Sequence, residues 1–328
     1  MERMTDDLVI QTVSLLAATL RLATPLVLAS LGGLFCERAG IVDIGLEGKM
    51  LGAAFAAAAT AAVTGSAWLG LAAAIAVAIA LALVHGYAAI TQHGNQVVSG
   101  MALNILVAGL APTLAAAWFH HGGNTPQLAG AARFAPIELP FMQELTALPG
   151  IGLVFDQLVD GHTLPVYLAI AAVPLTALIL MRTRFGLRLR AVGENPQAVD
   201  AAGLSVARLR YQALLCTGLL CGIAGADLSL AQSAGFFRDM TAGRGYLALA
   251  ALIFGKWRPL PTLLACLLFA LADAVQTRLQ GVVLPWVGAI PVQFIQALPY
   301  ILTVLLLAGF VGKARPPKAI GMPYVRSR

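Results

Sequence analysis

The sequence has 328 residues, of which 59% are hydrophobic and only 11% are charged, and its net charge is +6 at pH 7. Soluble domains carry about 25% charged residues, so this composition predicts a protein whose main solvent is lipid. The positive charge does not indicate nucleic-acid binding. Most of the positive charge lies beside apolar segments, where basic residues serve to keep the connecting loops in the cytoplasm.

Nine apolar segments approach the length of a membrane span, which needs about 20 apolar residues. They cover residues 8–34, 46–65, 67–90, 97–119, 163–181, 211–231, 243–255, 260–279 and 291–311. We therefore expect an all-α polytopic bundle of about eight to ten spans, forming one transmembrane domain over residues 1–328. The segment 243–255 is short, which indicates a partial or re-entrant span. Gly218, Gly222 and Gly225 are spaced for close helix packing.

The charges of the loops predict the topology. Residues 120–162 carry one basic side chain against four acids, which favours a loop on the outside. Residues 182–210 carry six arginines and the tail 312–328 is also basic, so both should face the cytoplasm. Working back along the chain, the N-terminus is expected outside. Arg21 lies within the first segment, so either it faces the bundle interior or that segment forms two helices.

The hydrophilic segment 182–210 contains a short helix with both ends marked. Asn195 can cap its N-terminus, Pro196 fits the first helical position and Gly203 fits just past the last turn. A helix this short is only marginally stable in water, because the free-energy cost of nucleation exceeds the gain from extending the helix by a few residues. We therefore expect helix 195–202 to dock onto a soluble protein.

Signatures of catalysis are missing from the sequence. It contains no GxxxxGK[ST] nucleotide-binding loop, no HExxH and no GxSxG, and its five histidines lack metal-ligand spacing. The four cysteines form no CxxC pair and are expected to be buried thiols. We predict no catalytic residue and no metal site, so the chain should hydrolyse nothing by itself.

Charged side chains lie between the first two apolar segments, in the run GLFCERAGIVDIGLEGKMLGA. One interpretation is a short cytoplasmic loop with solvated charges. The other is a partly buried turn lining a cavity, with Glu37 or Asp43 paired to Arg38. Asp227 and Asp273 lie inside later apolar segments, where they either form ion pairs with Arg21 or Arg278 or line a cavity.

A polar stripe follows in the fourth apolar segment. Gln96, Ser99 and Gly100 share a helical face, and Asn104 extends this face by one turn. Such a stripe either lines a path for a polar neutral solute or holds neighbouring helices together by hydrogen bonds.

Four blocks of sequence resemble one family in the same order along the chain. They are GLFCERAGIVDIGLEGKMLGA, NQVVSGMALNIL, FGLRLRAVGENPQAVDAAGLSVARLRY, and GRGYLALAALIFGKWRP with LADAVQ. These blocks resemble the nucleoside and simple-sugar branch of ABC importer permeases, within the group that holds ribose-type and branched-chain amino-acid permeases. The resemblance runs from about residue 20 to about residue 310. It implies a membrane-spanning subunit of an ATP-driven importer for nucleosides or related sugar-like solutes, in a bacterial cytoplasmic (inner) membrane. Asp43 departs from the family pattern, in which a small amide such as Asn is expected.

The resemblance also implies partners and site residues. A separate ATP-binding subunit would hold ATP and Mg and receive the coupling helix in a groove. A second permease chain would complete a heterodimer, and a solute-binding lipoprotein or periplasmic protein would dock outside. The residues implied for coupling are Gly193, Glu194, Asn195, Pro196, Ala198, Ala201, Ala202 and Gly203. Those suggested for the substrate path are Asp43, Glu47, Gln96, Ser99 and Asn104. The alternative function is an ion-coupled secondary transporter acting alone, with Asp227 and Asp273 carrying the coupling ion.

Overall fold

The computed structural model describes residues 2–140, 152–279 and 315–325, the strand pairs 283–284 and 288–289, and the single residues 297, 301 and 304. Its long helices are α1 (Glu2–Arg38), α2 (Leu46–Thr64), α3 (Ala67–Gly86), α4 (Gln96–Phe119), α7 (Leu164–Arg182), α10 (Val206–Ala226) and α12 (Pro259–Leu279). Its shorter helices are α6 (Gly152–Leu158), α8 (Arg184–Glu194), α9 (Pro196–Ala201) and α11 (Arg244–Phe254). A 3-10 turn, η2 (Gly130–Ala132), and two π-helical turns, η1 (Tyr87–Thr91) and η3 (Asp227–Gln232), complete the helical elements. The antiparallel pair β1 (Val283–Leu284) and β2 (Gly288–Ala289) is minimal, so the all-α prediction is confirmed.

Seven helices in the described part of the chain are long and apolar enough to cross a membrane. They contain the first six predicted segments and the segment 260–279. Helix α11 has 11 residues, in agreement with the partial span expected at 243–255. The predicted span 291–311 lies outside the described residues, apart from three isolated positions.

Local chemistry sets several of the helix boundaries. Helix α2 ends at Gly65, whose φ of +69° lies in the left-handed region that glycine adopts without strain. Ser66 then caps α3 by accepting a hydrogen bond from the amide of Leu69. Asn95 caps α4 through its Oδ1 atom, which accepts from the amides of Val97 and Val98 at 3.0 and 3.1 Å.

Helix α1 runs without a break through Arg21 and Pro25. Of the two sequence interpretations, a pair of separate helices is therefore wrong. The side chain of Arg21 instead lines a cavity between α1 and α12.

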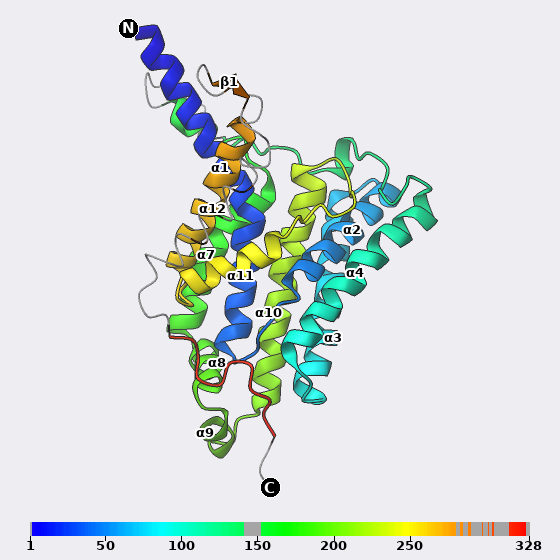
Figure 1. Ribbon diagram of the computed structural model, residues 1–328, viewed down its shortest axis with the longest axis vertical. Helices are drawn as coiled ribbons and strands as arrows, with labels where there is room; N and C mark the ends of the chain where they lie inside the picture. The colour runs from blue at the N-terminus through cyan, green and yellow to red at the C-terminus, as the bar shows by residue number, and fades with distance from the viewer. Residues whose placement is uncertain are drawn as a thin grey trace.

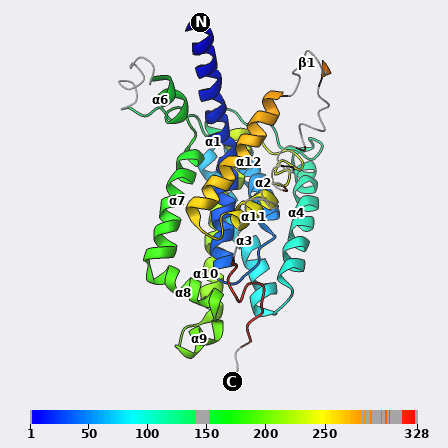
Figure 2. The same cartoon turned by 60° about the vertical axis from the view of Figure 1, so that its left-hand side comes forward.

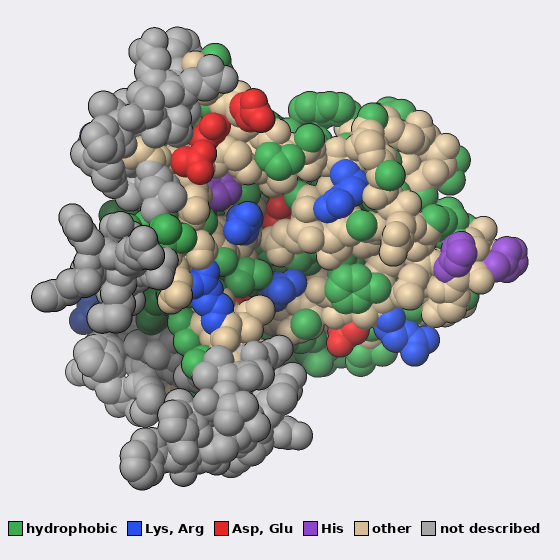
Figure 3. Space-filling view, turned by 90° about the horizontal axis from the view of Figure 1, so that it is seen from above, with side chains coloured by type: hydrophobic (Ala, Val, Ile, Leu, Met, Phe, Trp, Pro, Cys, Tyr) green, Lys and Arg blue, Asp and Glu red, His purple; other side chains and the backbone are tan. Residues whose placement is uncertain are grey.

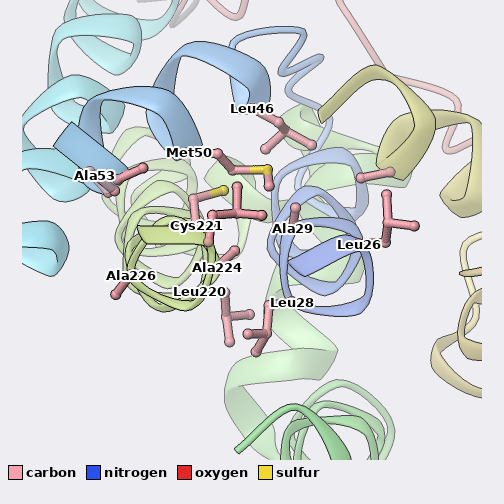
Figure 4. Packing of buried hydrophobic residues seen from close by; sticks show 14 of the residues in the cluster. Leu26, Leu28, Ala29, Leu46, Met50, Ala53, Leu220, Cys221, Ala224 and Ala226 are labelled. Atoms are coloured by element: carbon pink, nitrogen blue, oxygen red, sulfur yellow. The ribbon is translucent and has the colours of Figure 1, made fainter. Parts of the chain in front are cut away.

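Helices α1, α2 and α10 form the centre of the bundle, and α3 packs along α10. Gly218 and Gly222 permit this approach, since a Cβ atom at either position would lie only 2.7 or 2.6 Å from a Cα atom of α3. Figure 4 shows Cys221 and Ala224 of α10 facing Met50 of α2 and Ala29 of α1. Small residues thus permit the close contact of α3 with α10, as the glycine spacing predicts.

The chain places its predicted cytoplasmic and outside segments at opposite ends of the bundle. Helices α8 and α9 lie beside the tail 315–325 at one end, here called the α9 end (Figures 1 and 2). The start of α1 and the loop after α4 lie at the other end. The relative placement of the two termini is therefore the predicted one.

The outer faces of the helices are apolar. Trp68 of α3 and Ile105 of α4 are 64% and 70% exposed. In a soluble protein such side chains would be unusual in this number, whereas on a membrane bundle they contact lipid.

Candidate functional site

The α9 end carries a two-helix bracket formed by α8 and α9. Asn195 separates the helices, and its Oδ1 atom accepts a hydrogen bond of 3.0 Å from the amide of Ala198. Pro196 occupies the first position of α9. Gly203, with a φ of +79°, follows the last turn and donates to the carbonyl of Asp200 at 2.9 Å. The predicted marks at both ends of this helix are therefore confirmed.

Helix α9 has one buried face and one exposed face. Its only buried residue is Val199, which packs with Val192, Val206 and Leu209 in a small separate core. Among the residues suggested for coupling, the exposed ones are Glu194, Asn195, Ala198, Ala201, Ala202 and Gly203. The exposed face thus consists mainly of small side chains that another protein could approach closely.

Helix α8 was not predicted, since the sequence interpretation placed only one short helix within 182–210. Thr183 caps it by accepting from the amide of Gly186 at 3.1 Å. Phe185, Leu189 and Val192 recur at spacings of four and three and turn toward the protein. This helical period was readable in the sequence but was obscured by the surrounding arginines.

Gly193 lies in the last turn of α8, where a larger side chain would meet the backbone of α1. A Cβ atom here would lie 2.2 Å from the carbonyl oxygen of Arg38, at the end of α1. Gly193 is buried, unlike most of the other suggested coupling residues, and its neighbour in space is backbone. The bracket is therefore in direct backbone contact with the end of α1.

The tail 315–325 crosses the same junction. The amide of Ala319 donates to the carbonyl of Gly193 at 2.8 Å, and the amide of Gly321 donates to the carbonyl of Gly40 at 3.1 Å. The guanidinium of Arg210, which is only 1% exposed, donates to the carbonyl of Met322 at 3.2 Å. The tail thus connects the bracket, the end of α1 and the start of α10, an arrangement that the sequence analysis did not predict.

A second candidate site surrounds the turn between α1 and α2, residues 39–45. Asp43 and Lys49 are fully buried and form an ion pair, with His85 Nε2 at 3.9 Å from the same carboxylate. Burial alone would raise the pKa of Asp43, but the charges of Lys49 and His85 outweigh it and lower this pKa below its ordinary value. The turn is therefore a buried one with paired charges, not a solvated loop.

The predicted pairing of this turn with Arg38 is wrong. The guanidinium of Arg38 donates instead to the carbonyl of Trp257, and the indole N–H of Trp257 donates to Glu37. These bonds fasten the end of α1 to the connection between α11 and α12. Because the guanidinium of Arg38 is engaged with this carbonyl, it does not pair with Asp43.

The polar stripe of α4 faces the same turn. Gln96 Oε1 accepts from the amide of Val42 at 2.7 Å, and Ser99 Oγ lies 3.1 Å from His85 Nδ1. Asn104 Oδ1 accepts from the amide of Gly48 at 2.8 Å, close to the start of α2. These bonds join α4 to the turn, to α3 and to α2.

Glu47 links the turn to α11. Its two carboxylate oxygens accept from the amides of Gly243 and Gly245 at 2.8 and 2.6 Å, at the start of this short helix. A carboxylate at a helix N-terminus also interacts favourably with the helix dipole. The amide group of Asn104 adds a bond of 2.9 Å to the hydroxyl of Tyr246. The five residues suggested for the substrate path therefore lie around the turn 39–45 and the start of α2, and Glu47 and Asn104 connect this polar cluster to α11.

The two acids in the later apolar segments do not form the suggested ion pairs in the described part of the chain. Asp227 Oδ2 accepts instead from the amide of Gln232 at 2.7 Å. The same amide group donates to the backbone carbonyl of Arg21 at 3.0 Å. Ion pairs among the described residues are confined to those of Asp43.

Seven helices that can span a membrane, with the bracket of α8 and α9 at one end, define a polytopic helical membrane protein within the described part of the chain. The chain belongs to the family described as "Branched-chain amino acid transport system / permease component", whose sequence model matches residues 15–308. It is thus a membrane-spanning subunit of an ABC importer, a multi-pass protein of the bacterial inner membrane.

Three relatives match the chain over most of its length. It is 36% identical to the nucleoside ABC transporter permease protein NupC of Lactococcus lactis, over 98% of this chain and 99% of the relative. It is 38% identical to the guanosine ABC transporter permease protein NupQ of Bacillus subtilis, with the same coverage. It is also 38% identical to the putative glucose ABC transporter permease protein TsgC13 of Haloferax volcanii, over 90% of both chains.

No group of three or more His, Cys, Asp or Glu side chains suited to a metal ion occurs among the described residues. The four cysteines are unpaired thiols, three of them buried.

Proposed function

We propose that this subunit carries nucleosides or related sugar-like solutes and that a separate ATP-binding chain drives it through α9. The observation that carries the solute class is the similarity to NupC and NupQ over 98% of this chain. In this proposal the α9 end faces the cytoplasm, together with the loop 182–210 and the tail 312–328. Residues 120–162 face outside, and the whole chain 1–328 acts as one domain.

In this proposal the chain carries out no catalytic step. ATP and Mg bind to the partner subunit, and this chain needs no cofactor of its own. A second permease chain completes a heterodimer across the path, and a solute-binding lipoprotein or periplasmic protein delivers the solute at the end opposite α9. The exposed, small-residue face of α9 supports its role as the contact for the ATP-binding subunit.

For the substrate path we propose an indirect role for most of the suggested residues. Asp43, Glu47, Gln96 and Asn104 are at most 8% exposed and bond to protein groups, so they fix the position of α11 and of the turn 39–45. Tyr246, held by Asn104, is 41% exposed at the start of α11 and is the side chain of this cluster most accessible to a solute.

The decisive experiment places a bulky side chain on the exposed face of α9. Ala198→Trp should abolish nucleoside uptake and stimulation of the ATPase in proteoliposomes that contain all subunits, while the chain still inserts. The matched control is Ala117→Trp, at an exposed position of α4, which should leave both activities unchanged. Normal ATP-dependent uptake by Ala198→Trp would contradict the proposal, and uptake driven by an ion gradient without the ATPase would favour the secondary transporter.

A further inference from the structure

A cavity of about 690 Å³ lies at the end of the bundle opposite α9. Its walls come from α1, the η2 segment, residues 161–163, η3 and α12, so parts of the chain that are far apart in sequence converge on it. The polar cluster around Asp43 does not contribute to these walls.

The charged groups on the cavity wall are all arginines. Arg21 of α1, Arg133 beside η2 and Arg278 of α12 line it, and the described wall includes no Asp or Glu. Figure 3, which looks onto this end, shows Lys and Arg side chains toward the middle of the face, with Asp and Glu side chains beside them. Three guanidinium groups around one cavity repel each other unless an anion lies between them.

The protein itself uses only part of the hydrogen-bonding capacity of these guanidinium groups. Arg278 donates to the carbonyl of Gln11 and to the hydroxyl of Ser14, and Arg133 donates to the carbonyl of Ala231 at 3.2 Å. The side chain of Arg21 donates to no described residue, and none of the three lies within 4.0 Å of a described carboxylate. Each guanidinium has five N–H donors, so most donors remain available to a ligand.

One ionisable side chain, His162, lies beside the cavity wall. His162 lies between two residues of the cavity wall, Gly161 and Thr163. Burial is the main cause that lowers the pKa of His162, and the positive charge of Arg21 lowers it further, whereas backbone hydrogen bonds and the charge of Asp160 act in the opposite direction. The charge of Arg21 thus acts on the side chain beside the cavity wall.

We propose that this cavity binds an anionic phosphate ester through Arg21, Arg133 and Arg278. Arginine forks match phosphate oxygens in bidentate geometry. The cavity is larger than a single phosphate needs, and Leu22, Phe134 and Ala274 give it apolar walls for the remainder of the molecule. Either the headgroup of an anionic lipid or a soluble phosphate ester supplies this chemistry. The inference does not rest on the proposed nucleoside transport, because it concerns a different site and an anionic ligand.

The test uses the full-length chain in nanodiscs without its ATPase, so a failure of transport cannot be mistaken for a failure of binding. One arm titrates glycerol 3-phosphate onto the chain in phosphatidylcholine nanodiscs. The other adds phosphatidylglycerol to the nanodisc and measures the retained lipid by native mass spectrometry. Binding in the first arm alone identifies a soluble ester, and binding in the second alone identifies a lipid headgroup.

The test variants replace arginines of the cavity wall, and the control variant replaces an arginine that does not line the cavity. Arg21→Gln/Arg133→Gln should weaken binding of the active probe about tenfold or more, since two charged hydrogen-bonding groups are lost. Arg238→Gln, an exposed arginine that does not line the cavity, is the matched control and should stay within about twofold of the wild type. If the double variant folds poorly, Arg21→Gln alone provides the test, because the side chain of Arg21 donates no hydrogen bond to a described residue.

Three results would overturn the proposal. The first is failure of both probes to bind the wild-type chain. The second is an equal loss of binding in Arg238→Gln, which would indicate a general effect of surface charge. The third is unchanged binding of the active probe in the wall variants, which would show that the arginines of this cavity do not hold the phosphate.

Discussion

The backbone amide of Ala319 donates a hydrogen bond of 2.8 Å to the carbonyl of Gly193, which joins the tail to the last turn of α8. Gly193 in turn presses against the carbonyl of Arg38. The tail, the bracket and the end of α1 therefore meet at one residue without a side chain. This junction is one of the contacts through which the bracket touches the bundle, beside the packing of Val199 against α10.

Gly193→Ala is expected to disturb this junction. The added methyl group would lie 2.2 Å from the backbone oxygen of Arg38, which cannot move aside as a side chain could. We expect a loss of about 1–3 kcal/mol in the free energy of unfolding, together with a loss of uptake. Thermal unfolding in detergent and transport in proteoliposomes measure the two effects. Gly109→Ala is the control, since a Cβ there meets nothing within 4 Å, and it should unfold no more easily than the wild type.

Glu47→Gln tests the link between α2 and α11. The glutamine keeps one carbonyl oxygen but turns an NH₂ group toward the second backbone amide, so one of the two bonds is lost and the other loses its charge. We expect a cost of about 2 kcal/mol in chemical unfolding. Glu138→Gln, at an exposed position outside the cluster, should change the unfolding midpoint little. An equal shift in both variants would show that Glu47 does not hold α11.

The buried pair of Asp43 and Lys49 should show strong coupling in a double-mutant cycle. Asp43→Asn leaves the ammonium group of Lys49 buried without its anion, which costs about 3–5 kcal/mol in buried pairs. Asp43→Asn/Lys49→Met removes both charges and should be clearly more stable than the sum of the single changes predicts. Additive effects in urea unfolding would contradict the ion pair.

The stability of the segment around His162 should depend on pH. Because its pKa is lowered in the folded chain, the unfolded chain binds more protons as the pH falls through the ordinary range of histidine, near 6.5. Stability is therefore expected to decrease from pH 7 toward pH 5. His162→Gln should flatten this part of the curve, measured by hydrogen exchange of the loop before α7. A slope that is unchanged in the variant would assign the effect to another group.

The sequence was sufficient for features that depend on local chemistry. The caps of α9 at Asn195 and Gly203 follow from the preferences of single residues for single backbone conformations. The spans follow from length and hydropathy. The helical period in α8 was present as well, at Phe185, Leu189 and Val192, and only the density of arginines hid it.

Contacts between distant segments could not be read in the same way. Arg38 and Lys49 lie five and six positions from Asp43, so sequence separation could not select Lys49 as its partner. The choice depends on the direction in which α1 ends, which points Arg38 toward the carbonyl of Trp257. The meeting of the tail with Gly193 depends on the packing of the whole bundle.

The order of the segments along the chain has a consequence for biosynthesis. Residues 315–325 follow every helix that they touch, so the ribosome must have made α1 through α12 before the bonds to Gly193 and Gly40 can form. The carbonyls of Gly193 and Gly40 therefore receive these two bonds only after α12 has been synthesised, so the α9 end is completed later than the bundle that carries it.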